Sequence, residues 1–222
     1  VPEPFNVVDF YYEARHCCQE ILDRGKVPII VGGSGFYIHA FIYGPPSGPP
    51  SVPEVRNALE DEMQRLGPDI LYDRLKQLDL QYAQSITRND KHKIIRALEI
   101  ISLTGKKVSR LSWTGRRKPV NFDFRCWFLH RPKDILYHRI EKRCDKMIDD
   151  GLLTETEHLE MEGLRNNTSA SQAIGYRQAL EFLASQRTKD DYKKFIDDFK
   201  QASRNYAKRQ FTWFRKEPLF GW

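Results

Sequence analysis

The stretch Pro28-Ile29-Ile30-Val31-Gly32-Gly33-Ser34-Gly35-Phe36-Tyr37 decides the fold class. Its first four residues are wholly apolar, a pattern typical of a strand buried on both faces of a parallel sheet. The glycine-rich turn leads into a helix that we expect to begin at Phe36, and another helix is predicted before the strand, over 9–23. Helix, buried strand, glycine-rich turn and helix predict an α/β fold, with a ligand at the carboxyl end of the strand.

A change of pattern divides the chain. The segment 44–53 carries five prolines and two glycines, so it cannot form regular structure and marks a domain boundary. Beyond it the apolar spacing is purely helical. We therefore predict a small all-helical insertion domain over 53–110, within an α/β core formed by 1–52 and 111–222. The basic segment 105–118 would be the return strap of the insertion.

Local signals give the expected boundaries of further elements. Ser51 and Glu54 have the spacing of a capping box, and Asn89 is a candidate N-cap for a helix that ends at Gly105. Outside the insertion, we expect a strand over 122–129 and helices over 134–149 and 190–215.

Composition excludes several classes of protein. The 222 residues are 40% apolar and 12% aromatic, which is enough for a core and argues against disorder. A mean hydropathy of −0.62, with no long apolar run, argues against a membrane span. No signal peptide opens the chain, and the four cysteines have no CxxC spacing. These features predict a cytoplasmic protein with reduced thiols and no membrane association.

The positive charge is clustered. The net charge is only +6, yet residues 105–118 carry +6, residues 88–96 carry +3 and residues 201–222 carry +4. A single cluster of this kind is usually a solvated surface. Three clusters interleaved with aromatic residues such as Trp113 and Trp213 favour a polyanionic partner, since phosphates attract the cations and unpaired bases stack on exposed rings.

Three places could carry chemistry, and each has an ordinary explanation. The Gly32–Gly35 turn can bring backbone N–H groups close to an anion, although such a turn is more often only a turn, and no Gly-Lys-Ser/Thr follows it. His92, Arg96 and Glu99 share one helix face, either as a solvated Arg–Glu pair or as a patch that grips phosphates. Arg139 and Arg143 would pair with Glu141 or Asp145, or bind a diphosphate.

Two further segments combine cations with aromatic rings. Ala173–Gln178 holds a glycine in a helix-like stretch, where it costs about 1 kcal/mol relative to alanine, so something should require it. Lys208–Arg215 places cations and a glutamine between bulky aromatic side chains, which a helix used only for packing would not need.

Together, in this order, these pieces resemble the tRNA dimethylallyltransferase family (tRNA isopentenyltransferases) of bacterial type. The resemblance covers nearly the whole chain, and its C-terminal motifs are the most specific. The matching motifs are VGGSGFY (31–37), PEVR (53–56), NDKHKIIRALEI (89–100), TGK (104–106), HRIEKRCDKMIDDGLL (138–153), AIGYRQ (173–178) and YAKRQFTWFR (206–215).

The resemblance implies a P-loop-kinase-like parallel-sheet core and transfer of a dimethylallyl group from dimethylallyl diphosphate to N6 of adenosine 37 in tRNA. It implies Mg²⁺ as cofactor, the tRNA anticodon stem-loop as partner, and a helical insertion that clamps this stem-loop. The flipped adenine would enter one mouth of a channel and the diphosphate the other. We expect the protein to act as a monomer.

The resemblance also assigns residues. Ser34 and Arg143 are the expected catalytic residues, and Gly32, Gly33 and Arg143 are expected at the diphosphate. No metal ligand is assigned. The residues expected to contact tRNA are Ser34, Arg56, His92, Lys93, Ile94, Ile95, Arg96, Gln172, Ala173, Ile174, Gly175, Tyr176, Arg177, Lys208, Arg209, Gln210, Phe211, Thr212, Trp213, Phe214 and Arg215.

One departure separates this sequence from the family pattern. The family opens with a glycine-rich P-loop and an Asp proposed as general base, and Val1 aligns downstream of both. We therefore expect a sheet core that is incomplete at its N-terminus and impaired transfer by the chain as written. Two alternatives stay open: an adenylate isopentenyltransferase that acts on a free nucleotide, and a non-catalytic RNA-binding module.

Overall fold

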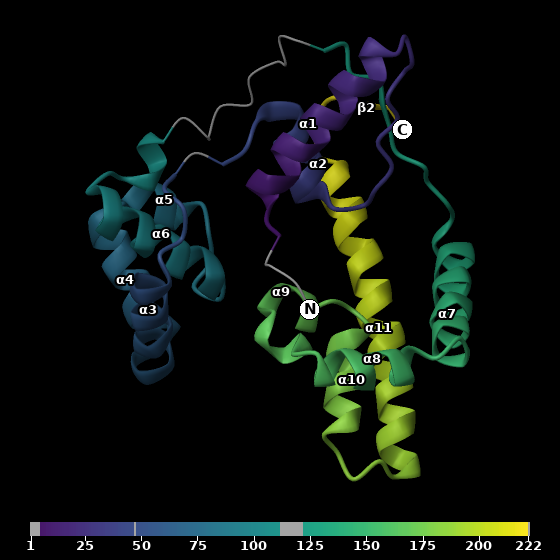
Figure 1. The fold of residues 1–222 in the computed structure, drawn as a ribbon. Helices are drawn as coiled ribbons and strands as arrows, with labels where there is room; N and C mark the ends of the chain where they lie inside the picture. The colour runs from purple at the N-terminus through teal and green to yellow at the C-terminus, as the bar shows by residue number, and fades with distance from the viewer. Residues whose placement is uncertain (1–4, 47, 112–121, 222) are drawn as a thin grey trace. The chain divides into compact units, whose positions relative to one another are not determined.

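The computed structural model describes residues 5–46, 48–111 and 122–221 (Figure 1). Contacts divide the chain into two compact units. The first, called the core unit here, contains the described residues of 1–44 and 119–222, and the second, called the helical unit, contains those of 45–118. Each unit has its own buried cluster of side chains.

The core unit opens with two packed helices. α1 (Val7–Asp23) begins where the side chain of Asn6 accepts hydrogen bonds from the N–H groups of Val8 and Asp9, and α2 (Gly35–Tyr43) packs against it. Both helices confirm the sequence prediction to within two residues. Cys18 of α1 and Phe41 and Ile42 of α2 form the centre of their shared core.

The strand expected at Pro28–Val31 is absent from the described structure. These residues form no regular element, and the side chains of Val27, Ile29 and Val31 are 82%, 82% and 91% exposed. A strand of a parallel sheet needs neighbours on its edges and layers on its faces, and the described residues supply neither here. The prediction rested on side-chain pattern alone, which cannot show whether partner strands are present.

The described residues contain one small sheet. β1 (Cys126–Trp127) pairs in parallel with β2 (Phe220–Gly221), Cys126 opposite Phe220. The strand expected over 122–129 is thus confirmed only at its centre. The pairing ties the end of the chain to the segment that leads into α7.

The remainder of the core unit is helical. α7 (Lys133–Asp149) and α11 (Lys189–Phe214) confirm the two long helices expected from the sequence, which did not predict the elements between them. α11 packs against α7 and α10 at one end and reaches α2 at the other (Figure 1). The intervening elements are α8 (Leu152–Met161), η3 (Leu164–Asn166), α9 (Thr168–Ser171) and α10 (Tyr176–Leu183).

Every regular element described in the helical unit is a helix. They are α3 (Pro53–Leu66), α4 (Pro68–Leu78), α5 (Leu80–Gln84), α6 (Lys91–Thr104) and η1 (Val108–Arg110). Apolar side chains spaced along α3, α4 and α6 meet in one core around Leu71, Leu75 and Ile94, all fully buried. α6 ends where Gly105 adopts the left-handed conformation (φ 66°), as expected of a C-cap glycine.

Two cap predictions in the helical unit are wrong. Ser51 forms no capping box with Glu54; the N-cap of α3 is Val52, and the Ser51 hydroxyl donates to Glu99 instead. The N-cap of α6 is Asp90 rather than Asn89, because the Asp90 carbonyl accepts the first helical hydrogen bond, from the N–H of Ile94 (3.0 Å). The capping box was predicted wrongly because local spacing cannot show that Ser51 binds Glu99, 48 positions away.

Candidate functional site

The glycine-rich turn packs directly on the C-terminal half of α11. A Cβ built on Gly33 would overlap the side-chain amide of Gln210, and one built on Gly35 would overlap the indole of Trp213. A Cβ on Gly32 would meet no described atom within 4 Å. Gly33 and Gly35 are therefore in close contact with protein side chains, and Gly32 is the glycine of the turn that leaves open space. Ser34 lies between them, at the N-cap of α2.

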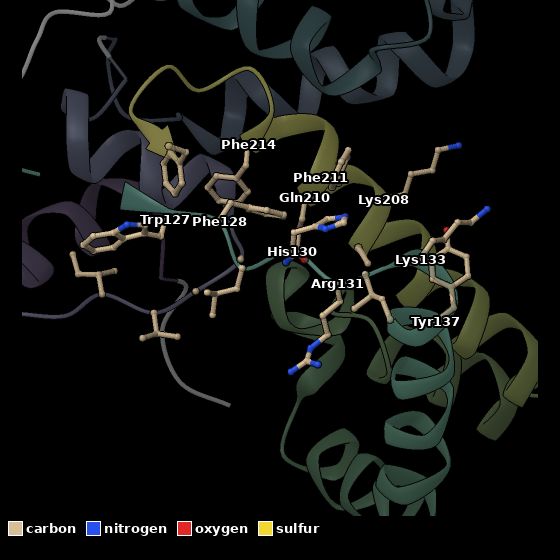
Figure 2. A pocket seen from close by; sticks show the side chains of 18 residues that line it. Trp127, Phe128, His130, Arg131, Lys133, Tyr137, Lys208, Gln210, Phe211 and Phe214 are labelled. Carbon is tan, nitrogen blue, oxygen red and sulfur yellow. The ribbon is translucent and has the colours of Figure 1, made fainter. Parts of the chain in front are cut away.

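A cavity of about 740 Å³ opens beside this turn (Figure 2). Its walls come from the turn, from the segment after β1, from the start of α7 and from α11. It thus joins the segments 31–37 and 206–215, which the sequence analysis singled out separately. Its described lining consists of Ile30, Val31, Gly32, Gly33, Trp127, Phe128, Leu129, His130, Arg131, Lys133, Leu136, Tyr137, Ala207, Lys208, Gln210, Phe211, Phe214 and Phe220.

Aromatic rings form one wall of the cavity. The ring centroid of Phe128 lies 6.0 Å from that of Phe211 and 5.5 Å from that of Phe214, and the His130 ring lies 5.6 Å from Phe211. Figure 2 shows these side chains grouped at the centre of the view. Such a wall suits an apolar group, and its rings can also attract a cation.

Three cations lie around the same cavity. Arg131, Lys133 and Lys208 are exposed lining residues, and Figure 2 shows Lys133 and Lys208 extending on the same side. Of these, only Lys208 was a candidate from the sequence. Arg131 and Lys133 were missed because they lie just before α7 and at its first residue, outside the three charge clusters. An apolar wall beside cations fits a ligand with an apolar part and an anionic part.

A buried pair holds α2 against the end of α11. His39 Nδ1 lies 3.2 Å from Glu217 Oε1, and the two side chains are 15% and 4% exposed. The His39 ring also lies edge-on to Trp213, with centroids 6.5 Å apart. Sequence analysis gave no signal for this pair, whose members are 178 positions apart. The His39–Glu217 contact therefore helps to hold α2, and the glycine-rich turn before it, close to the end of α11.

Arg143 stands away from the cavity. Arg139 and Arg143 are exposed on α7, and the described lining includes neither, although it includes Lys133 and Tyr137 from the start of the same helix. The expected surface pairing within α7 is also wrong, because Glu141 binds Arg204 (2.6 Å) and Asp145 binds Lys200 (2.6 Å), both on α11. The role of Arg143 at a diphosphate stays a prediction.

The segment 172–177 is half structural. Gln172, Ala173 and Arg177 are exposed, whereas Ile174 and Tyr176 pack against the core formed by α7, α8, α10 and α11. Gly175 precedes α10 with φ 104°, a conformation that favours glycine, and a Cβ there would lie 3.5 Å from the Phe199 ring. This explains a glycine that the sequence left unexplained.

Tyr176 is fixed by a hydrogen bond. Its hydroxyl donates to Glu155 Oε1 (2.6 Å), and this bond, with burial and the carboxylate charge, raises the pKa of Tyr176 to about 12. The side chain therefore links α10 to α8. Any contact of this segment with RNA would come mainly from its exposed members.

The segment 208–215 divides in the same way. Lys208, Arg209, Thr212 and Arg215 are exposed, Gln210 and Phe211 are half-buried, and Phe214 is buried. Trp213 is 41% exposed although it packs on Gly35. The guanidinium of Arg209 lies over the Tyr206 ring, 5.5 Å from its centroid. The cations of this segment are thus exposed, whereas the Phe214 ring is buried from the surface and lines the cavity, and its expected contact with tRNA stays a prediction.

In the helical unit, the expected contact segment is only partly at the surface. His92 and Lys93 are exposed, but Ile94 and Ile95 are 0% and 4% exposed, so their side chains cannot reach a ligand. The expected Arg96–Glu99 pair is present (2.6 Å), but it is not a solvated surface pair, because Glu99 is fully buried. Arg56, also expected at tRNA, is half-buried and pairs with Glu60 (2.8 Å).

Part of the predicted basic surface is neutralised or lies outside the described residues. Arg88 binds Asp69 and Asp73, each at 3.0 Å. Lys106, Lys107 and Arg110 are exposed. Trp113 and the cations at 116–118 lie outside the described residues. The polyanionic partner that the three clusters favour stays a prediction.

Comparisons with known proteins agree with the resemblance seen in the sequence. The IPP transferase family model matches residues 1–217. The chain is 70% identical to a tRNA dimethylallyltransferase of Protochlamydia amoebophila over 222 residues, which is all of this chain and 64% of that protein. It is 48% identical to the same-named protein of Chlamydia felis, over 99% of this chain and 65% of that one. The chain thus spans about two thirds of the length of these relatives, and they confirm the bacterial type.

Solved structures match along nearly the whole chain. One is the full-length tRNA isopentenylpyrophosphate transferase of Bacillus halodurans, with TM-score 0.63 and 35% identity, covering 99% of this chain and 67% of that one. Another is a eukaryotic dimethylallyltransferase acting on tRNA, with TM-score 0.73 and 28% identity, covering 95% and 53%. The fold is therefore that of this class of transferases, which confirms the expected fold class. The chain belongs to the IPP transferase family.

No helix in the described ranges combines the length and the apolar character needed to cross a bilayer.

Proposed function

We propose that the protein is a tRNA dimethylallyltransferase of the cytoplasm, active as a monomer. It transfers a dimethylallyl group from dimethylallyl diphosphate to N6 of adenosine 37 in the anticodon stem-loop. The bond from the allylic carbon to the diphosphate oxygen breaks, a carbon–N6 bond forms, and N6 loses a proton. Family membership supports this, and one observation carries it: the Gly32–Gly35 turn packs on Gln210 and Trp213 beside a cavity with an aromatic wall and cations.

The leaving diphosphate would be stabilised by cations at the cavity. Arg131, Lys133 and Lys208 lie around its aromatic wall, where fixed positive charge lowers the energy of a developing anion. The open space at Gly32 allows a phosphate to approach the backbone closely. Arg143 keeps its proposed diphosphate role, which requires that α7 bring it nearer than in this structure.

The acceptor and the allyl group would use the other parts of the site. The rings of Phe128, Phe211 and Phe214 offer an apolar surface for the dimethylallyl group and keep water away from it. Ser34, at the N-cap of α2, would form a hydrogen bond near N6 of the adenine. This bond would orient the amine for attack.

Magnesium, which the resemblance implies, does not fit the described cavity. Mg²⁺ prefers oxygen ligands, usually including a carboxylate. The described lining contains no Asp or Glu, and its charged members are Arg131, Lys133 and Lys208. In the proposed reaction these cations, rather than a metal ion, neutralise the charge of the diphosphate.

Binding of tRNA would use exposed cations of both units. On α11 these are Lys208, Arg209 and Arg215, and at the start of α6 they are Lys91 and Lys93 together with His92. Exposed lysines and arginines release counterions when they bind phosphates, so affinity should fall with salt. Trp213, which is 41% exposed, is available for stacking on a flipped base.

A salt titration tests the RNA-binding part. In the full-length protein, replacing Lys208 and Arg209 by Ala should weaken tRNA binding and reduce the slope of log affinity against log salt by about one unit per lost phosphate contact. The matched control replaces Lys189 and Lys193, two exposed lysines at the other end of the same helix. An unchanged slope, or an equal change in the control, would overturn the assignment of Lys208 and Arg209 to RNA.

Kinetics of Ser34 variants test the reacting site. Ser34→Ala should lower turnover more than tRNA affinity, while Ser34→Thr, which keeps the hydroxyl, should retain most of the turnover. Equal losses of turnover and affinity in Ser34→Ala would remove the role of Ser34 at the amine. Two outcomes would favour the alternatives: a free adenine nucleotide that competes equally with tRNA as acceptor, or salt-sensitive tRNA binding without any transfer.

A further inference from the structure

A buried carboxylate holds the segment that leads into the helical unit. Glu99 on α6 is 0% exposed. Its Oε1 accepts hydrogen bonds from the Ser51 hydroxyl (2.6 Å) and from the N–H of Val52 (2.9 Å), and its Oε2 accepts one from Arg96 Nη1 (2.6 Å). Arg96 Nη2 donates in turn to the carbonyl of Pro49 (2.5 Å). The first connecting segment (48–52) is thereby fixed to α6 at Pro49, Ser51 and Val52.

A second buried carboxylate holds the segment that follows α6. Asp79, between α4 and α5, is 1% exposed. Its Oδ2 accepts from the N–H of Ser109 (2.8 Å) and its Oδ1 from the N–H of Tyr82 (3.1 Å). Val108, beside Ser109, is buried in the core of the helical unit. The second connecting segment (105–111) is therefore attached through Ser109 and Val108.

Both carboxylates are ionised at neutral pH. Burial opposes ionisation of Glu99, but the hydrogen bonds from Ser51, Arg96 and Val52 outweigh it and hold the pKa of this carboxyl below its usual value. For Asp79 burial is likewise outweighed, by the bonds from Ser109 and Tyr82 and by the charge of Lys107, so its pKa is also lowered. Each connecting segment is thus held by charge-assisted hydrogen bonds, which are stronger than neutral ones.

Stability alone does not explain these two charges. An apolar side chain of similar volume would pack in a helical core without the cost of burying a charge. It could not, however, accept hydrogen bonds from the backbone N–H groups of Val52 and Ser109. The two carboxylates bind the segments through which the chain enters and leaves the helical unit. The direction of these two segments determines how the chain continues beyond the unit.

We propose that Glu99, with Arg96, and Asp79 are positioning residues that fix the directions in which the two connecting segments leave the helical unit. They thereby limit the orientations in which that unit can meet its ligand. The second statement rests on the proposed function, because the ligand there is tRNA. The first does not depend on it.

Hydrogen exchange in the full-length protein tests the first statement. In Glu99→Gln, which keeps the size of the side chain, the Val52 amide should exchange about tenfold faster or more, while the Ser109 amide and the core amides of α4 and α6 stay unchanged. Asp79→Asn should accelerate Ser109 and leave Val52 unchanged. Faster exchange throughout the helical unit in either variant, or no change at the target amide, would overturn the proposal.

Distance measurements and kinetics test the consequence. Spin labels at Gln77 on α4 and Lys142 on α7, both exposed, with Cys17→Ser to remove the exposed native thiol, should give a broader distance distribution in Glu99→Gln than in the parent. The same variant should raise KM for tRNA several-fold with little change in kcat. An unchanged distribution would overturn the orienting role, whereas absence of tRNA binding by the parent protein would overturn the proposed function and leave the exchange result standing.

Discussion

The indole ring of Trp213 fills the space in which a side chain on Gly35 would begin. Gly35 is the first residue of α2, and Trp213 lies near the end of α11, so this contact sets how closely the two helices approach. The ring is rigid and is also held edge-on by His39. Neither partner can shift without moving a helix.

Gly35→Ala should therefore destabilise the protein by about 1–3 kcal/mol, the usual cost of forcing extra volume into a packed contact. Urea unfolding at neutral pH measures it. Gly32→Ala is the matched control, because its new Cβ meets no described atom within 4 Å. Equal effects of the two substitutions would contradict the packing argument.

Gly33→Ala should cost less than Gly35→Ala, because its Cβ meets the amide of Gln210, the far end of a flexible side chain that can rotate away. The effects of substitutions at Gly33 and Gln210 on stability should nevertheless be coupled. In a double-mutant cycle, Gln210→Ala should relieve most of the effect of Gly33→Ala on the free energy of unfolding. If the effects of Gly33→Ala and Gln210→Ala on the free energy of unfolding simply add, the contact between these residues does not contribute to stability.

The pair His39–Glu217 should contribute to the stability of the core unit. Glu217→Ala leaves His39 Nδ1, now 3.2 Å from the carboxylate, without this acceptor, and should cost about 1–3 kcal/mol. Glu217→Gln keeps an oxygen acceptor and should cost less. Thermal unfolding of the two variants compares them, and a larger loss in Glu217→Gln would be inconsistent with a hydrogen bond donated by His39.

The helical unit should lose stability in acid. Because the folded-state pKa values of Asp79 and Glu99 lie below their usual values, the folded state binds fewer protons than the unfolded state at acidic pH. Their contribution is fully present above the unfolded pKa of about 4 and is lost as the pH falls through the folded values. Asp79→Asn with Glu99→Gln should lower the free energy of unfolding at pH 7 and flatten its dependence on pH below about 5. Urea titrations measure both, and an unaltered acid dependence would refute the prediction.

Tyr176 should ionise at about pH 12, because its hydroxyl donates to Glu155. A raised folded-state pKa favours the neutral phenol, so this contribution to stability is present below the unfolded pKa of about 10 and is lost as the pH rises through 12. In an absorbance titration, Tyr176→Phe should remove one tyrosine ionisation step, at about pH 12. Glu155→Gln should move that step toward the usual tyrosine value, and a step that stays in place would contradict the assigned cause.

Helices were predictable where an apolar stripe or a cap lies within the element itself. This holds for α1, α7 and α11, whose expected bounds differ from the observed ones by two residues or fewer. It also holds for the end of α6, because a left-handed C-cap requires little more than a glycine. Interactions between residues a few positions apart decide these features, so the sequence alone is enough to predict them.

Features that depend on a distant partner were predicted poorly. Pro28–Val31 has the composition of a buried strand, but a strand exists only with neighbours to pair with. Ser51 has the spacing of a capping residue and instead binds Glu99. Ile94 and Ile95 lie within a basic motif yet point into the core, and Arg131 and Lys133 reach the cavity from outside any motif.

The sequence by itself determined the long helices α1, α7 and α11, the two-part division of its pattern and the family, because periodicity, caps and motifs are local features of the chain. Only the tertiary structure decided which members of each motif face a ligand and which serve as packing. It decided that Gly33 and Gly35 make room for Gln210 and Trp213, and that Glu99 holds a connecting segment. The reason is physical: burial and hydrogen-bond partners are properties of residues brought together from far apart, and no local spacing encodes them.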